Sequence, residues 1–169
     1  AAARSRHLVF TGPPGVGKTE VARIIAKMYF GLGILATDKV VEVAPDDFVA
    51  HGSGAPEQRS RTIFDSAIDG VLFIDEAYSL DHDGRTGGDA AGGKVIDGLL
   101  ATMENNRDRM VVIVAGHEDA MTTFLDRNDG LKSRFSRQIR FPSYGPADLV
   151  EIASRMAWQK YGAVVTDAA

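Results

Sequence analysis

Close to its start the chain contains the glycine-rich segment Gly12-Pro13-Pro14-Gly15-Val16-Gly17-Lys18-Thr19. It matches the pattern G-x-x-x-x-G-K-[ST], a loop whose backbone N–H groups surround phosphates. The short apolar segment in front of it, Leu8-Val9-Phe10, predicts a buried strand. The apolar residues behind it recur at helical spacing and predict one face of a helix: Val21, Ile24, Ile25 and Met28. Strand, glycine loop and helix, in this order, are the context in which the pattern binds phosphate.

The residue types of the loop suit this chemistry. Its three glycines allow backbone angles and a close phosphate approach that a Cβ atom would block. Its N–H groups form an anion-binding concavity, to which the N-terminus of the next helix adds partial positive charge. We expect Lys18 to reach the β- and γ-phosphates and the Thr19 hydroxyl to ligate Mg²⁺. The alternative is a glycine-rich turn that binds nothing.

An acidic pair follows the clearest buried strand, Val71-Leu72-Phe73-Ile74. Ligands of open α/β sheets bind beyond the carboxyl ends of strands. We therefore expect Asp75 to hold Mg²⁺ with Thr19, and Glu76 to orient and polarise the attacking water as a general base. A helix-capping acid pair is the structural alternative. Together with the glycine loop, the pair indicates hydrolysis of a nucleoside triphosphate, and the absence of an N-K-x-D element favours adenine.

The composition narrows the classes of partner. A length of 169 residues fits one domain with a proper core. The net charge of −4 argues against a nucleic-acid binder, which needs a basic face. Without cysteine there are no disulfides or thiolate metal sites. No apolar run approaches the ~20 residues of a membrane span, no signal peptide is recognisable, and the first residue is not Met. We expect an excised piece of a longer, cytoplasmic protein.

Strands and helices alternate along the chain. Further strands are expected at 40–43, 71–74, 110–114 and 138–141, and helices after Pro56, around 95–103, around 121–125 and from Pro146. We expect loops at 44–54 and 81–93 and a turn at 127–130. Continuous apolar strands alternating with helices predict an α/β fold with a mostly parallel five-stranded sheet flanked by helices. In the last helix, the simplest interpretation of the apolar residues is core contact: Leu149, Ile152, Met156 and Trp158.

Three motifs in this order resemble those of the AAA+ ATPases: the glycine loop, VLFIDEA at 71–77 and GLKSRF at 130–135. Finer similarities point to the CbbX/CfxQ-like branch: DGVLFIDEAY at 69–78, MENNRD at 103–108 and RFPSY at 140–144. The resemblance covers residues 7 to about 156 and is greatest to the ATPases of mycobacterial type VII (ESX) secretion. It implies a three-layer P-loop NTPase domain over residues 1–144 and the beginning of a helical lid, truncated, over 145–169.

The resemblance also implies roles for single residues. Arg134 matches the arginine finger that enters a neighbouring subunit's site, where such residues contribute about 10³–10⁵ in rate; Arg137 is the second candidate. A finger acting in trans implies a ring, a hexamer in this family, whereas a solvated surface arginine is the alternative. At the sensor-1 position stands His117, which either donates a hydrogen bond there or is a plain loop residue.

Two loops are less informative. Relatives grip polypeptide with an aromatic pore residue, but Gly52 stands at that position, Phe48 is expected to be buried, and His51 is the candidate for facing a pore. Threading of polypeptide is therefore not predicted. His82 is interpreted as part of a solvated acidic loop rather than as a metal ligand, because no second ligand stands at helical spacing.

The leading hypothesis is the core of an oligomeric ATP hydrolase that uses ATP and Mg²⁺ and remodels or dissociates protein partners. The partners implied are secreted substrates and secretion chaperones, or an inhibited Rubisco if the chain is a CbbX-type activase; no nucleic acid and no direct membrane insertion are expected. A nucleotide-dependent switch or scaffold that hydrolyses little is the alternative from another class. A nucleic-acid motor is disfavoured by the acidic balance, and a small-molecule kinase by Asp75, Glu76 and Arg134.

Overall fold

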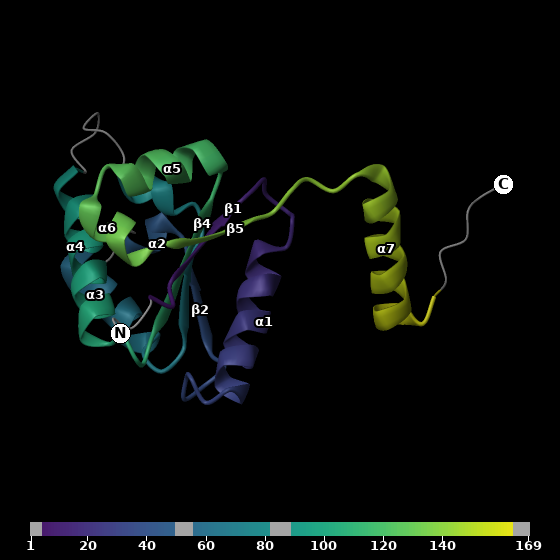
Figure 1. Cartoon of the computed structure of the whole chain (residues 1–169), viewed down its shortest axis with the longest axis horizontal. Coiled ribbons are helices and arrows are strands. Elements are labelled where there is room, and N and C mark those ends of the chain that lie inside the picture. Colours follow the sequence, from purple (N-terminus) through teal and green to yellow (C-terminus); the bar gives the residue numbers. More distant parts are fainter. Residues whose placement is uncertain (1–4, 50–55, 82–88, 164–169) are drawn as a thin grey trace.

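The computed structural model describes residues 5–49, 56–81 and 89–163 (Figure 1). Its sheet has the strand order β2-β3-β4-β1-β5. The strands are β1 (Leu8–Thr11), β2 (Val40–Val43), β3 (Val71–Ile74), β4 (Val111–Gly116) and β5 (Arg137–Arg140). Every neighbouring pair in this sheet is parallel. The predicted α/β fold with five strands is thus confirmed, and no described strand is antiparallel.

Helices cover both faces of the sheet, which gives three layers (Figure 1). Helix α1 (Lys18–Gly31) lies on one face, where its buried side chains pack against the strand residues that point to that face. The other face carries α2 (Pro45–Val49), α3 (Pro56–Ser66), η1 (Ala77–Asp81), α4 (Asp89–Asn105), α5 (Glu118–Asp126) and α6 (Asp129–Arg134). Successive strand residues point to opposite faces, so Leu8 and Phe10 join the α1 core and Val9 joins the other.

The inner strands β1, β3 and β4 are buried along their whole length, as their continuous apolar sequences predict. The edge strand β5 is exposed at all four residues and reads Arg-Gln-Ile-Arg. Charged side chains on an edge strand oppose pairing with another chain. The polar sequence of β5 therefore fits its place at the edge.

The buried face of α1 differs from the predicted apolar stripe. Ile24 and Met28 are 62% and 48% exposed, whereas Ala22, Ile25 and Ala26 face the sheet. Alanines one helical turn apart let the helix backbone approach the strands closely, and larger side chains at these positions would hold it off. The hydrophobic spacing thus identified the helix and the inward position of Val21 and Ile25, but the buried side is turned from Ile24 and Met28 toward the two alanines.

Local structure adds two short helices where loops or turns were predicted. Residues 45–49, predicted as a loop, form α2, and Phe48 within it is fully buried, as expected. The predicted turn at 127–130 becomes the start of α6, because the Asn128 side chain accepts a hydrogen bond from the Leu131 N–H (3.1 Å) and caps the helix. Helix α4 begins at Asp89, inside the predicted loop 81–93. The pore-loop residues His51 and Gly52, and His82, lie outside the described residues.

The prediction of core contacts for the last helix is wrong. Helix α7 (Pro146–Tyr161) has no buried residue, and Leu149, Met156 and Trp158 are 54%, 61% and 63% exposed. Figure 1 shows α7 standing apart from the three layers. The apolar stripe therefore has no partner within the described part of the chain. The division at residue 144 remains a prediction.

None of the described helices is both long enough and apolar enough to cross a membrane.

The start of β1 is fixed by a buried histidine. His7 is 5% exposed, and its Nδ1 accepts a hydrogen bond from the Val112 N–H in β4 (3.0 Å). Burial, and secondarily the nearby charge of Arg134, lower the pKa of His7 to about 4. The imidazole is therefore neutral at pH 7, as its acceptor role requires.

His7 makes the stability of the fold depend on pH. The pKa of an unfolded histidine is 6.5, so the unfolded chain binds the proton more readily than the folded chain between pH 6.5 and about 4. We expect the free energy of unfolding to fall by about 3 kcal/mol across this interval on acidification. His7→Asn, which keeps an acceptor but does not titrate, should remove this part of the slope in denaturant titrations at several pH values. An unchanged slope would contradict the assignment.

Candidate functional site at the carboxyl ends of the strands

The glycine loop joins β1 to α1 at the carboxyl edge of the sheet. Its first N–H, that of Gly12, donates to the carbonyl of Gly116 at the end of β4 (3.1 Å). Beside it, the Phe141 N–H donates to the carbonyl of Thr11 (2.7 Å). The loop therefore begins wedged between the strands on either side of β1.

Two features of this wedge require glycine at position 12. Its φ is +151°, which side chains rarely permit. A Cβ atom would also lie 2.3 Å from the carbonyl oxygen of Phe141. Gly15 and Gly17 also have positive φ, at +77° and +90°. The three glycines thus stand where the chain adopts conformations that other residues avoid.

Lys18 occupies the centre of the loop. Its side chain is buried, and its Nζ donates to the carbonyl oxygens of Gly12 (2.8 Å) and Pro13 (2.9 Å). The ammonium thus lies inside the loop, at the N-terminus of α1, with Thr19 next in the helix. Phosphate oxygens entering the loop would replace these neutral carbonyls as partners of a full positive charge.

Tyr144 also supports the loop, and its role was missed by the sequence analysis. It follows β5, and its hydroxyl donates to the Val16 carbonyl (2.9 Å). The contact joins the phosphate loop to the segment that leads into α7. Its only sequence signal is its place in the RFPSY motif, because the two residues are far apart along the chain.

The acidic pair follows β3, separated from the loop by one strand, β4. The Asp75 N–H donates to the Val43 carbonyl (3.0 Å), and the Glu76 N–H donates to Oδ1 of Asp75 (3.0 Å). Glu76 has a φ of +52°, in the left-handed region that residues other than glycine seldom adopt. Its Oε2 accepts a hydrogen bond from the Tyr78 hydroxyl. This bond, and after it burial, raise the pKa of Tyr78 to about 12.

His117 follows β4, at the N-cap of α5, with an exposed side chain. Because β4 lies between β3 and β1, His117 stands between the acidic pair and the glycine loop. A cavity of about 350 Å³ adjoins the loop here, lined by residues that include Gly12, Pro13, His117, Arg140 and Ser143. The structure thus brings the predicted site residues at 12–19, 75–76 and 117 to one edge of the sheet.

Arg134 lies at the opposite end of the strands, where β1 and β5 begin. It ends α6 just before β5, whose first residue, Arg137, pairs with Leu8 at the start of β1. The glycine loop follows the other end of β1, three residue steps or about 10 Å further along. The structure therefore does not bring Arg134 together with the loop of its own chain. Arg137, the second candidate, is an exposed residue of β5 at this same edge.

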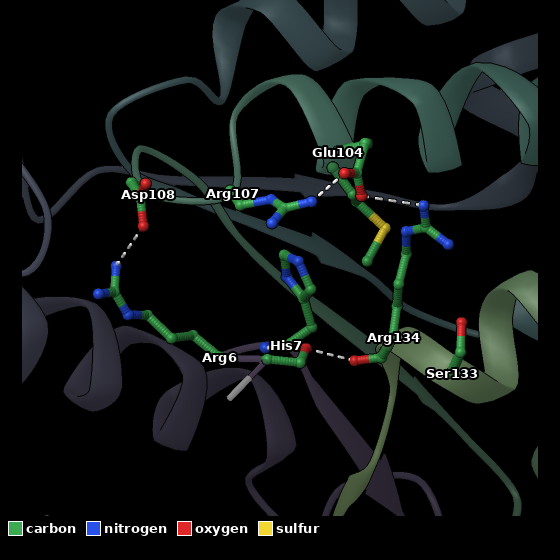
Figure 2. Close-up of a pocket in the computed structure, with 9 residues that line it drawn as sticks. Arg6, His7, Glu104, Arg107, Asp108, Ser133 and Arg134 are labelled. Carbon is green, nitrogen blue, oxygen red and sulfur yellow. Dashed lines mark hydrogen bonds and ion pairs between the residues drawn. The ribbon is translucent and has the colours of Figure 1, made fainter. Parts of the chain in front are cut away.

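Arg134 is held at its edge by its own chain, as Figure 2 shows. Its Nη2 lies 3.1 Å from Oε2 of Glu104. Its Nη1 also donates to the Gly130 carbonyl (3.3 Å). Glu104 also pairs with Arg107. These groups line a pocket of about 220 Å³: Ser5, Arg6, His7, Met103, Glu104, Arg107, Asp108, Ser133 and Arg134. Arg6 and Arg107 also line this pocket, where they pair with Asp108 and Glu104, and neither arginine was predicted from the sequence as a site residue.

The site's donors fit Mg²⁺ bound with a nucleotide better than a protein-only metal centre. Among the described residues, no group of three histidine or carboxylate side chains is arranged so that it could hold a metal ion. Asp75 and Thr19 offer oxygen donors, the type that Mg²⁺ prefers, and Mg²⁺ commonly takes its remaining ligands from phosphates and water.

Comparison with known proteins identifies the class of protein. The sequence profile of the ATPase family associated with various cellular activities (AAA) matches residues 8–143, and the chain belongs to this family. It is 54% identical over 156 residues to the ESX-3 secretion system protein EccA3 of Mycolicibacterium smegmatis, a match covering 92% of this chain and 25% of that protein. It is 47% identical over 167 residues to the ESX-1 secretion system protein EccA1 of Mycobacterium tuberculosis, covering 98% and 29%.

The predicted resemblance to AAA+ ATPases, and to those of type VII secretion in particular, is thereby confirmed. The chain spans about a quarter of the length of these curated relatives.

The close approach at Gly12 yields a prediction. Gly12→Ala should cost roughly 2–4 kcal/mol of unfolding free energy, because the added Cβ meets a backbone carbonyl at a strained φ, and it should abolish nucleotide binding. Gly33→Ala is the matched control: its φ is +66° with nothing within 4 Å, so only about 1 kcal/mol of strain is expected. Denaturant unfolding and nucleotide titration measure both. Equal costs for the two variants would contradict the close approach of residue 12 to the Phe141 carbonyl.

Proposed function

We propose that this chain is the Mg²⁺-dependent ATP hydrolase core of an oligomeric AAA ATPase that remodels or dissociates protein partners in type VII (ESX) secretion. The main support is that the glycine loop, with Lys18 inside it, and the acidic pair lie at the same edge of the sheet. Phosphate binding alone would need only the loop. A strand-end acid beside it adds the group that hydrolysis requires.

Each residue then has a defined part in the reaction. Backbone N–H groups of residues 12–17 and the Lys18 ammonium bind the β- and γ-phosphates of ATP. Thr19 and Asp75 would hold Mg²⁺, which neutralises phosphate charge when bound. Glu76 orients a water molecule and accepts its proton as the water oxygen bonds to the γ-phosphorus and the bond to the bridging oxygen breaks. His117, which follows β4 between the acidic pair and the glycine loop, would donate a hydrogen bond near that water.

Arg134 provides the argument for self-association. It lies at the edge of the sheet away from its own loop, in a pocket with Arg6 and Arg107. If it stabilises transition-state charge, it does so in a neighbouring subunit, whose carboxyl edge faces this pocket in a closed ring. We therefore propose a ring of identical subunits, with six as the expected number, in which each subunit completes its neighbour's site.

The partners follow from the relatives. EccA3 and EccA1 are named as ESX secretion system proteins, so we propose secreted proteins and secretion chaperones as partners, in the cytoplasm. A CbbX-type Rubisco activase would use the same hydrolytic core. Affinity capture distinguishes the two, because one enriches ESX substrates and the other Rubisco. The net charge of −4 supports no nucleic-acid partner.

A nucleotide-dependent switch with little hydrolysis is the second candidate. One observation favours it: both essential cations are paired within the chain, Lys18 with loop carbonyls and Arg134 with Glu104. A protein in this arrangement must exchange these partners before it can hydrolyse ATP quickly.

Glu76→Gln tests hydrolase against switch. The amide is a poor base, so turnover should fall by a factor of about 10²–10⁴, while ATP affinity should persist because the loop is untouched. Steady-state phosphate release and equilibrium nucleotide binding measure the two quantities in the full-length protein. Glu151→Gln, at an exposed acid of α7, is the matched control and should change neither. A wild type with bound ATP and no turnover would leave only the switch.

A further inference from the structure

Tyr78 connects the general-base candidate with the neighbouring strand. It lies in η1, two residues after Glu76, and its hydroxyl donates to Oε2 of that carboxylate. Its ring packs on Gly116, the last residue of β4, where an added Cβ would lie 2.8 and 2.9 Å from two ring carbons. The His117 ring is also near, at 6.5 Å between centroids. The side chain thus spans from the end of β3 to the end of β4.

This position fixes Tyr78 relative to the phosphate loop. The carbonyl of Gly116, the residue on which this ring packs, accepts the hydrogen bond from the Gly12 N–H (3.1 Å). One series of contacts therefore runs from Gly12 through Gly116 and Tyr78 to the carboxylate of Glu76. Each link is short and the strand at its centre is buried, so the carboxylate has a defined place relative to bound phosphates.

The chemistry of a carboxylate makes this contact useful. A carboxylate has two acceptor oxygens, and Tyr78 takes Oε2, which leaves Oε1 for a water molecule. The donor is neutral, so it orients the carboxylate without the strong pairing that a lysine or arginine would impose. Its pKa of about 12 keeps the hydroxyl protonated, and so a donor, throughout the pH range in which proteins work.

We propose that Tyr78 is a positioning residue of the hydrolytic site, which holds one oxygen of Glu76 so that the other faces the attacking water. The proposal rests on the proposed function, since it gives Glu76 its orientation rather than its role. In this role Tyr78 acts through Glu76 and not through a contact of its own with the nucleotide. Its effect should therefore appear in the rate of the chemical step and not in nucleotide affinity.

Tyr78→Phe tests the proposal, because it keeps the ring against Gly116 and removes only the hydroxyl. A hydrogen bond to a charged group is lost, so kcat should fall about 10-fold to 100-fold, with KM and the Kd for ATP unchanged. The measurement is steady-state ATP turnover and nucleotide binding by the full-length protein. Tyr161→Phe, at a tyrosine that is 74% exposed near the end of α7, is the matched control and should leave kcat unchanged.

A double variant separates positioning from a general structural effect. If Tyr78 acts through Glu76, adding Tyr78→Phe to Glu76→Gln should cause no further loss of the residual turnover. A structural defect would instead multiply the two losses and lower the stability of the single variant.

The outcomes distinguish this inference from the proposed function. If Tyr78→Phe leaves kcat unchanged, raises kcat or changes only KM, the role of Tyr78 is overturned. The proposed function is kept in that case, provided that the wild type hydrolyses ATP and Glu76→Gln does not. A raised kcat would mean that the tyrosine holds the carboxylate away from water. Absence of wild-type turnover would overturn both.

Discussion

The parallel pairing of β1 with β4 on one side and β5 on the other determines where the glycine loop and Arg134 lie. In this register Leu8 lies opposite Ile113 and Arg137, and Thr11 lies opposite Gly116 and Arg140. The end of β1 therefore delivers the glycine loop beside the ends of β4 and β5, while its start lies beside the residues that precede β5. One strand of four residues thus separates the phosphate loop from Arg134. A reversed β5 would place both on the same edge and remove the reason for a second subunit.

In the same arrangement, the two cations that we propose to bind phosphate are paired with groups of the chain itself. The Lys18 ammonium is bonded to carbonyls of the loop, and the Arg134 guanidinium to Glu104. Both groups are partly or wholly removed from water, so each needs a partner at all times. In the proposed reaction, phosphate oxygens would replace these internal partners, and Arg107 would remain as an ion-pair partner of Glu104. Paired cations that exchange partners are consistent with a site completed only on assembly.

The sequence was sufficient for the sheet and for the residues of its carboxyl edge. Continuous apolar strands, and the glycine or acidic residues that follow them, are local signals in the sequence. The parallel topology then brings the carboxyl ends of these strands to one edge of the sheet. Packing decided what the sequence could not: the small alanines of α1 face the sheet in place of Ile24 and Met28, and the stripe of α7 has no partner among the described residues. The partners of Tyr78 and Arg134 were also missed, because contacts with Gly116 and Glu104 join separate parts of the chain.

A mixing experiment tests the proposal that each active site is shared between two subunits. Glu76→Gln subunits keep an intact Arg134, and Arg134→Ala subunits keep an intact Glu76, so both should be nearly inactive alone. Equal mixing and reassembly should restore turnover at about a quarter of the interfaces, where an intact site meets an intact finger. Turnover of the mixture that equals the average of the two separate variants would contradict action in trans and place Arg134 outside the catalytic site.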